Sequence, residues 1–193
     1  MYLEKLKLHN FRCYEKLEID FNRQLTVLVG KNGSGKTTVL EAIAIALGTW
    51  FVGFNIVNAK GINKRTDPLR KAYQIGATDD VQTQFPVEIE AWGKIEESKD
   101  QILHWKRELY TPTGTMTTKD AKEIVEYAAE YQKAISEGRT DIYLPMVAYY
   151  GTGRLWDYHR QKRTDVFKVS SRTNGYIDCL DGTANVKLMM DWF

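Results

Sequence analysis

The chain has 193 residues, of which 43% are hydrophobic and 27% charged, a balance that predicts a globular domain and excludes a disordered chain. Its 27 basic and 25 acidic residues leave a net charge of +2, which excludes a nucleic-acid binder defined by bulk charge but allows a local basic patch. The N-terminus lacks an apolar signal sequence and no stretch reaches the roughly 18 apolar residues of a membrane span, so we expect a cytoplasmic protein without membrane contact.

The first fifty residues carry strand, turn and helix patterns in succession. Hydrophobic and polar residues alternate over residues 2–11 and 17–21, which predicts two strands joined by a turn at residues 12–16. Residues 25–29 form an apolar run typical of a strand buried on both faces. Residues 36–47 favour a helix with almost no polar face, which Gly48 should end and which should pack against the sheet.

The middle of the chain is less regular. Residues 49–83 show no sustained period, whereas residues 85–91 and 102–110 alternate well and predict an antiparallel hairpin. Thr117 and Asp120 resemble the capping box of a helix start. The apolar period over residues 118–137 then predicts an amphipathic helix, which Gly138 should close.

The last fifty residues combine an apolar strand pattern with polar sequence. Residues 144–150 predict a strand, and residues 154–175 are polar and basic. Residues 184–193 predict the beginning of an amphipathic helix. Because the sequence stops inside this apolar pattern, we expect it to be truncated or to continue in a longer protein.

One segment carries recognisable chemistry. Residues 30–37 read Gly-Lys-Asn-Gly-Ser-Gly-Lys-Thr and match the phosphate-loop pattern G-x-x-x-x-G-K-[ST] without a mismatch. Glycines let the backbone wrap a phosphate with its N–H groups exposed, and the positive end of the following helix faces the same place. The predicted ATP-binding residues are Gly30, Lys31, Asn32, Gly33, Ser34, Gly35, Lys36, Thr37 and Thr38.

Three of these residues have specific predicted roles. Lys36 should bridge the β- and γ-phosphates, the Thr37 hydroxyl should bind Mg²⁺, and Thr38 should reach the α-phosphate. The loop follows a predicted strand and opens a predicted helix, which is the context of a genuine phosphate loop. The sequence therefore predicts ATP and Mg²⁺ as cofactors.

Other candidate motifs do not hold. Residues 63–67, Asn-Lys-Arg-Thr-Asp, fail as a guanine-reading N-K-x-D motif because Thr66 occupies the aspartate position, and we interpret them as surface. The two cysteines and three histidines show no metal-binding spacing. We interpret Cys13 and Cys179 as free thiols in a reducing compartment.

The N-terminal half resembles a known family. Residues 8–14, Leu-His-Asn-Phe-Arg-Cys-Tyr, followed by a strand and the phosphate loop, resemble the N-terminal half of a RecF/SMC-type ABC ATPase head. Residues 149–156, Tyr-Tyr-Gly-Thr-Gly-Arg-Leu-Trp, and residues 172–193 resemble a narrower bacterial group of AAA-family predicted ATP-binding proteins. Some members of that group are linked to virulence or anti-phage defence, and PtuA of the Septu system is a relative.

The resemblance implies an α/β P-loop fold of ABC-ATPase type. An N-terminal antiparallel β lobe would join a mixed central sheet, with the phosphate loop and first helix within residues 1–48. Residues 49–143 would form an insertion of antiparallel strands and a helix. Residues 144–193 would supply a strand and the start of a helical subdomain, so the chain would be the N-terminal part of one head.

The resemblance also implies a function. ATP binding and hydrolysis would be coupled to homodimerisation of heads across ATP, in anti-phage defence or DNA metabolism, with DNA or a defence effector as a possible partner. Arg12 would reach the phosphates from its turn; the alternative is a solvated turn arginine.

Several residues of a complete head are missing from the sequence. It contains neither the Leu-Ser-x-Gly signature nor Walker B carboxylates, since Asp79 and Asp80 do not follow a buried strand. The Q-loop glutamine of such a head, which follows a strand, is also not evident: no glutamine directly follows residues 144–150, and Gln161 lies far along. We expect ATP binding with poor or no hydrolysis by this chain, and no catalytic residue beyond the phosphate contact of Lys36.

Some alternatives stay open. The protein could be a P-loop small-molecule kinase, or a module in which ATP drives assembly without hydrolysis. The basic cluster in residues 151–175 could be a solvated face or a contact for a polyanion. Arg154 could contact nucleotide or form a local salt bridge, and the neighbouring aromatic residues could stack on bases or pack in the core: Tyr149, Tyr150, Trp156 and Tyr158.

Overall fold

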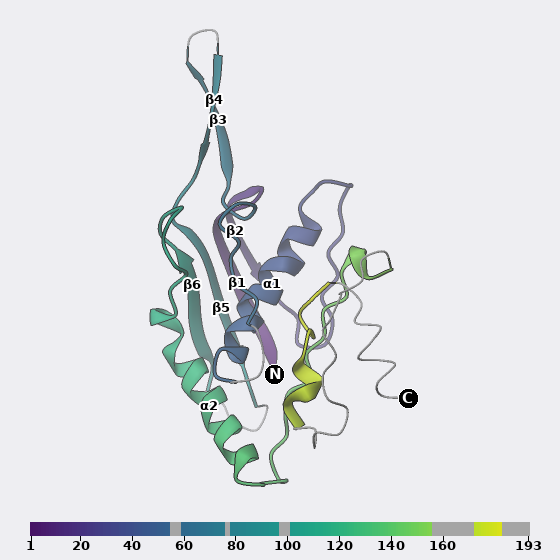
Figure 1. Cartoon of the computed structure of the whole chain (residues 1–193). Helices are drawn as coiled ribbons and strands as arrows, with labels where there is room; N and C mark the ends of the chain where they lie inside the picture. Colours follow the sequence, from purple (N-terminus) through teal and green to yellow (C-terminus); the bar gives the residue numbers. More distant parts are fainter. Residues whose placement is uncertain (55–58, 76–77, 97–100, 156–171, 183–193) are drawn as a thin grey trace.

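The computed structural model describes residues 1–54, 59–75, 78–96, 101–155 and 172–182 (Figure 1). The elements in chain order are β1 (Tyr2–Phe11), β2 (Tyr14–Asp20), α1 (Lys36–Phe51), β3 (Arg70–Ile75), β4 (Thr78–Thr83), β5 (Val87–Lys94), β6 (Leu103–Leu109), η1 (Lys119–Ala121), α2 (Lys122–Ser136), η2 (Thr152–Leu155) and η3 (Arg172–Tyr176). The helix expected at residues 184–193 lies outside the described residues.

Four strands form one antiparallel sheet in the order β2-β1-β5-β6. Leu8 of β1 lies opposite Leu17 of β2 on one side and Ile89 of β5 on the other. The two N-terminal strands and the antiparallel pairing of the strands predicted at 85–91 and 102–110 are confirmed. The turn between β1 and β2 is shorter than expected, because β2 begins at Tyr14 and only Arg12 and Cys13 remain outside the strands.

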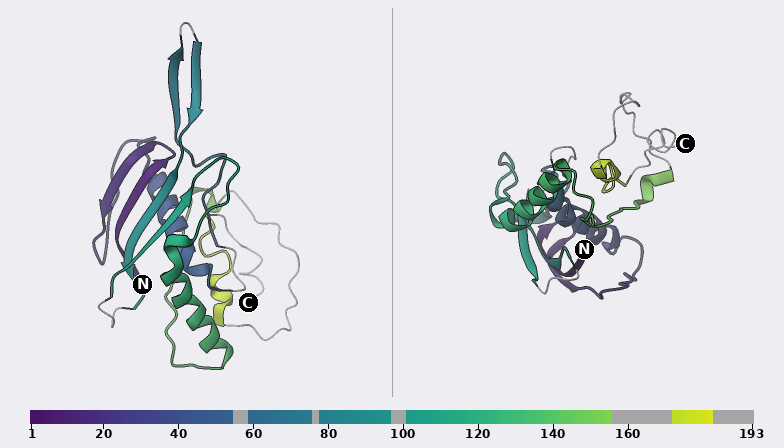
Figure 2. Two further views of the ribbon diagram at one scale, coloured as in Figure 1. Left: turned by 90° about the vertical axis from the view of Figure 1, so that its left-hand side faces the viewer. Right: turned by 90° about the horizontal axis from the view of Figure 1, so that it is seen from below.

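Helices α1 and α2 pack on the same face of this sheet (Figures 1 and 2). The alternating burial of β5 turns its apolar side chains toward them, and Trp50 and Trp105 are almost completely buried between the layers. The indole N–H of Trp105 donates to Ala46 O at 2.9 Å, which satisfies the polar atom inside the core. The expected burial of the first helix against the sheet is confirmed.

Gly48 does not end α1, which continues to Phe51. A Cβ atom built on Gly48 would lie 2.7 Å from the backbone oxygen of Lys60. The absence of a side chain therefore lets the segment before Ile62 cross the helix closely, and packing overrides the stop signal.

The second helix differs from expectation only at its start. Thr117 donates its backbone N–H to Glu108 O, and neither η1 nor α2 has a side-chain cap, so the predicted capping box does not form. At the other end the N–H of Gly138, with a φ angle of +80°, donates to Ile135 O and closes the helix as predicted. Within the described ranges no helix is long and apolar enough to cross a membrane.

Strands β3 and β4 form a separate hairpin that projects from the body (Figures 1 and 2). Every residue of β4 is exposed. Because no face of the hairpin enters the core, its sequence carries no apolar alternation, and residues 70–83 therefore show no sustained period.

Two predicted strands are wrong as far as the described residues reach. Residues 25–29 and 144–150 belong to no strand and pair with none there. Leu25, Val27 and Val29 are 72%, 67% and 90% exposed, and only Leu28 packs partly against the core, so the first run is not buried on both faces as expected. A strand is defined by its ladder partner, and apolar composition alone does not supply one.

The interpretation of residues 63–67 as surface is wrong for Asp67, which is 1% exposed. One carboxylate oxygen accepts a hydrogen bond from Arg12 Nε at 2.9 Å, and the other accepts from the N–H of Asn63 at 2.7 Å. The N–H of Arg12 also donates to the backbone oxygen of Asp67 at 2.6 Å. Asp67 therefore holds the β1–β2 turn.

Replacing the buried Asp67 with alanine should lower the free energy of unfolding by about 2–4 kcal/mol, because it leaves Arg12 Nε and the N–H of Asn63 without their acceptor. Urea denaturation measures the change. The matched control is Asp79→Ala on the exposed strand β4, which should change stability by less than about 0.5 kcal/mol. Equal effects of the two substitutions would contradict the buried clamp.

Candidate functional site

The phosphate loop joins the extended segment at residues 25–29 to helix α1. Gly33 and Gly35 have φ angles of +80° and +88°, in the left-handed region that other residues disfavour. The N–H of Ser34 donates to Lys31 O at 3.2 Å and closes a tight turn, and Gly35 directly precedes the helix. The conformation of the loop therefore requires glycine at two of the predicted positions.

The first turn of α1 leaves its backbone donors unpaired. The N–H of Val39 donates to Gly35 O at 3.1 Å, which is the first hydrogen bond of the helix. The N–H groups of Lys36, Thr37 and Thr38 thus have no intrahelical acceptor, and neither a capping side chain nor an acidic residue lies in this turn. Unpaired N–H groups and the helix dipole together favour an anion here.

The side chain of Lys36 folds back into the loop. Its ammonium group donates to Gly30 O and Lys31 O, each at 2.7 Å, and lies 3.4 Å from Ser34 Oγ. Residues 31–34 are exposed, so an anion can enter from solvent. An entering phosphate would meet the ammonium group and the free N–H groups of the helix in the same loop.

These groups fit a magnesium–nucleotide complex. The Thr37 hydroxyl is an oxygen ligand of the kind that Mg²⁺ accepts. In the part of the chain that the structure describes, no cluster of three or more His, Cys, Asp or Glu residues could hold a metal ion. Mg²⁺ would therefore take most of its ligands from phosphate and water, as it commonly does. The contacts of Thr37 and Thr38 with nucleotide stay predictions.

Arg12 lies in the turn beside the loop, with a φ angle of +52°. Its Nε is bound to Asp67, while the guanidinium carbon lies 5.4 Å from the centre of the Phe11 ring. The side chain is 30% exposed, so Arg12 is anchored rather than freely solvated. Its predicted phosphate contact stays a prediction.

The residues after Arg12 touch the phosphate loop directly, which sequence reasoning missed. The Tyr14 hydroxyl donates to Ser34 O at 3.0 Å, and Cys13 Sγ lies 3.8 Å from Thr38 Oγ1. Burial, with the nearby Cys13, raises the pKa of the Tyr14 hydroxyl above its ordinary value, so it remains a donor at neutral pH. No local signal could reveal these contacts, because they join residues about twenty positions apart.

A polar cluster fastens α1 to two later segments. Glu41 binds Lys60 Nζ at 2.6 Å and accepts a hydrogen bond from the Tyr149 hydroxyl at 2.8 Å. Lys60 also lies 4.7 Å from the centre of the Tyr149 ring. Burial, followed by the hydrogen bond to Glu41, raises the pKa of Tyr149 to about 12. Of the two alternatives for Tyr149, packing is the one that these contacts support.

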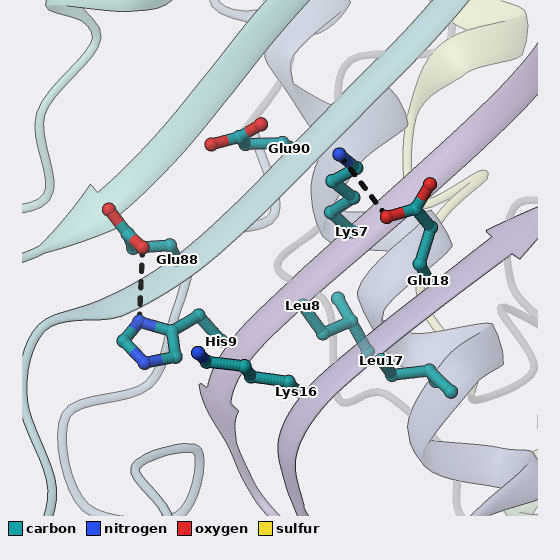
Figure 3. A pocket seen from close by; sticks show the side chains of 8 residues that line it. All are labelled: Lys7, Leu8, His9, Lys16, Leu17, Glu18, Glu88 and Glu90. Carbon is teal, nitrogen blue, oxygen red and sulfur yellow. Dashed lines mark hydrogen bonds and ion pairs between the residues drawn. The ribbon is translucent and has the colours of Figure 1, made fainter.

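The outer face of the sheet carries a shallow cavity of about 490 Å³ between β1, β2 and β5 (Figure 3). Two pairs of its polar side chains bind each other: Lys7 with Glu18 at 3.2 Å, and His9 Nδ1 with Glu88 at 3.1 Å. The phosphate loop contributes none of its lining residues. These side chains form a polar face of the sheet, and the candidate nucleotide site lies elsewhere.

Several predictions fall on residues that the structure does not describe. They include Trp156, Tyr158, Gln161 and most of the basic cluster in residues 151–175. Arg154 lies within η2, but its side chain is outside the description.

The family model of the AAA domain matches residues 5–191, which is nearly the whole chain. The chain belongs to this AAA domain family. A P-loop ATPase domain is thereby established, and the matched range includes the phosphate loop, Tyr14 and the β3–β4 hairpin.

Curated relatives resemble a short part of this AAA domain. The DNA replication and repair protein RecF of Clostridium acetobutylicum is 51% identical over 43 residues, 22% of this chain and 12% of RecF. The DNA double-strand break repair Rad50 ATPase of Methanopyrus kandleri is 53% identical over 45 residues, 23% of this chain and 5% of Rad50. Structural maintenance of chromosomes protein 6 of Saccharomyces cerevisiae is 47% identical over 47 residues, 24% of this chain and 4% of that protein. The AAA domain is therefore related to their ATPase regions and spans a small share of their length.

The two thiols should differ strongly in reactivity. Cys13 is exposed, whereas burial raises the pKa of Cys179 to about 11. Only the thiolate reacts, so the thiolate fraction of Cys179 at pH 8 should be roughly 100-fold lower than that of a thiol of ordinary pKa. The alkylation of Cys179 should therefore accelerate as the pH approaches 11. Timed iodoacetamide labelling with peptide mass spectrometry measures both sites, with Cys13→Ser as control. Equal labelling rates at pH 8 would contradict the burial of Cys179.

Proposed function

We propose that this AAA domain is the nucleotide-binding part of a RecF/SMC-like ABC ATPase head and binds Mg²⁺ and ATP at residues 30–38. The observation that carries the proposal is the phosphate loop, where the Lys36 ammonium group and the unpaired N–H groups of α1 share one exposed loop. Such a loop binds a triphosphate without a deep cavity. In the proposed complex Lys36 contacts the β- and γ-phosphates, Thr37 binds Mg²⁺ and Thr38 contacts the α-phosphate.

Two apolar edges beside α1 support a larger head. Residues 25–29 expose three aliphatic side chains, and Met146 is 94% exposed on the segment opposite. A groove of about 310 Å³ is lined by residues next to both segments and by Ile43 and Leu47 of α1. Unpaired extended chain with exposed apolar side chains favours pairing with another strand. We therefore propose a mixed central sheet in which further strands of the complete head join these segments.

Hydrolysis needs a carboxylate that positions the attacking water, and two carboxylates near the loop among the described residues are engaged elsewhere. Glu41 binds Lys60 and Tyr149, and Asp67 binds Arg12. We propose that the remainder of the head supplies this carboxylate, so that hydrolysis accompanies homodimerisation of two heads across the nucleotide.

The proposed biological setting rests on the relatives and on the resemblance of one segment of the sequence. The relatives are proteins of DNA replication, DNA repair and chromosome maintenance, which supports a role in DNA metabolism with DNA as a possible partner. A role in anti-phage defence, with an effector as partner, rests on the resemblance of residues 149–156. We propose a cytoplasmic location for either role.

A non-hydrolysing assembly module is the second candidate. The sequence has an intact phosphate loop but lacks both the signature and Walker B carboxylates. Both candidates require ATP binding, and they differ in phosphate release by the assembled protein. A small-molecule kinase would instead transfer phosphate as a monomer.

Lys36→Ala should weaken ATP binding by about 100-fold or more, because it removes the ammonium group from the loop. Isothermal titration calorimetry with Mg²⁺-ATP measures the affinity. Lys16→Ala removes the same charge from strand β2 and should bind like the wild type. If wild type and Lys36→Ala bind equally, the proposed site is wrong.

The chain should release little phosphate from ATP, because Glu41 and Asp67, two described carboxylates near the loop, are bound to other side chains. Phosphate release, and the molecular mass obtained by light scattering, are measured with Mg²⁺-ATP. Lys36→Ala is the baseline for both measurements. We expect phosphate release near that baseline, and any ATP-dependent doubling of mass should disappear in the variant. Rapid turnover by a monomer would contradict the head proposal and favour the kinase.

A further inference from the structure

The β1–β2 turn and the start of β2 contact the phosphate loop and the first turn of α1. Tyr14 donates to Ser34 O at 3.0 Å, and Cys13 Sγ lies 3.8 Å from Thr38 Oγ1. A Cβ atom built on Gly35 would lie 2.7 Å from Tyr14 Cζ and 2.8 Å from Cys13 Sγ. The turn is therefore packed directly against the backbone that leads into α1.

The turn itself is held from the opposite side. The Asp67 carboxylate accepts a hydrogen bond from Arg12 Nε, and the backbone oxygen of Asp67 accepts one from the N–H of Arg12. The N–H of Leu69 donates to Asn10 O at 2.9 Å, which adds a second backbone link. Tyr14 thus reaches the loop from a fixed support rather than from a mobile turn.

The hydrogen bond of Tyr14 determines how one loop peptide is oriented. The peptide between Ser34 and Gly35 is planar and trans, so its C=O and N–H groups point in opposite directions. Because Tyr14 binds the C=O group, the Gly35 N–H points away from the tyrosine. Among the described residues, no acceptor for the Gly35 N–H is present, so this donor is unused.

Without the hydrogen bond from Tyr14, the Ser34–Gly35 peptide could also adopt a second orientation. A flip of the Ser34–Gly35 peptide would move the φ angle of Gly35 from +88° to roughly the mirror-image region, which glycine occupies as readily. Such a flip would exchange the positions of the N–H and C=O groups and turn a carbonyl oxygen toward the phosphate. An acceptor there would repel an anion.

We propose that Tyr14 is a positioning residue that holds the Ser34–Gly35 peptide with its N–H presented to a nucleotide phosphate. The inference rests on the proposed function, since it names a residue that prepares the same site. Tyr14 acts through the loop backbone, so this role depends on the hydroxyl group and not on the aromatic ring.

The test is ATP affinity of Tyr14→Phe by calorimetry, because this change keeps the ring and removes the donor. We expect a rise in Kd of about three- to tenfold, the value of one hydrogen bond. Tyr2→Phe removes a hydroxyl that bonds Glu4 away from the loop and should leave Kd unchanged. The melting temperature of nucleotide-free Tyr14→Phe should equal that of the wild type, which separates positioning from loss of fold.

A second readout needs no nucleotide. In protein labelled with ¹⁵N-glycine, Tyr14→Phe should shift or broaden the Gly35 amide resonance and leave that of Gly138 unchanged. Wild-type affinity in Tyr14→Phe, or an affinity loss matched by a lower melting temperature, would overturn the positioning role alone. Failure of wild type itself to bind ATP would overturn the proposed function and the role of Tyr14 with it.

Discussion

The packing of α1 against the antiparallel sheet is the constraint on which the rest of the structure depends. The helix is buried along most of its length, and Trp105 of β6 both packs against it and donates to its backbone at Ala46. Burial of this apolar surface stabilises the layer arrangement and fixes the helix axis. Its first turn, from Lys36 to Thr38, therefore presents unpaired N–H groups at a defined place, and the anion-binding property of the loop follows from that geometry.

Polar contacts fix the positions of the segments around the phosphate loop, in addition to the apolar packing. Asp67 binds Arg12 at the turn beside the loop, and Glu41 binds Lys60 and Tyr149 farther along α1. Both carboxylates are largely withdrawn from water, where an unpaired charge would be costly, so each keeps its partners in place. The region around the phosphate loop is thereby assembled from four separate parts of the chain.

Agreement between sequence and structure follows the physics of each segment. Strands β1, β2, β5 and β6 were predictable because one face of each strand packs toward the core and the other faces solvent. Hydrophobic and polar residues therefore alternate along the sequence. The β3–β4 hairpin has no buried face and left no such record. Residues 25–29 and 144–150 have the apolar composition of strands, yet in the described part of the chain neither segment has a ladder partner, and Leu25, Val27, Val29 and Met146 are exposed.

The sequence by itself determined the phosphate loop, its glycines at positive φ, the buried helix that follows and the antiparallel character of the N-terminal lobe. These features are local, since a few consecutive residues set the backbone conformation and the period of burial. Only the tertiary structure decided that Asp67 is buried under Arg12, that Gly48 admits the backbone of Lys60, and that Tyr14 touches Ser34. Each of these contacts joins residues a dozen to more than fifty positions apart, and their meeting depends on how whole elements pack.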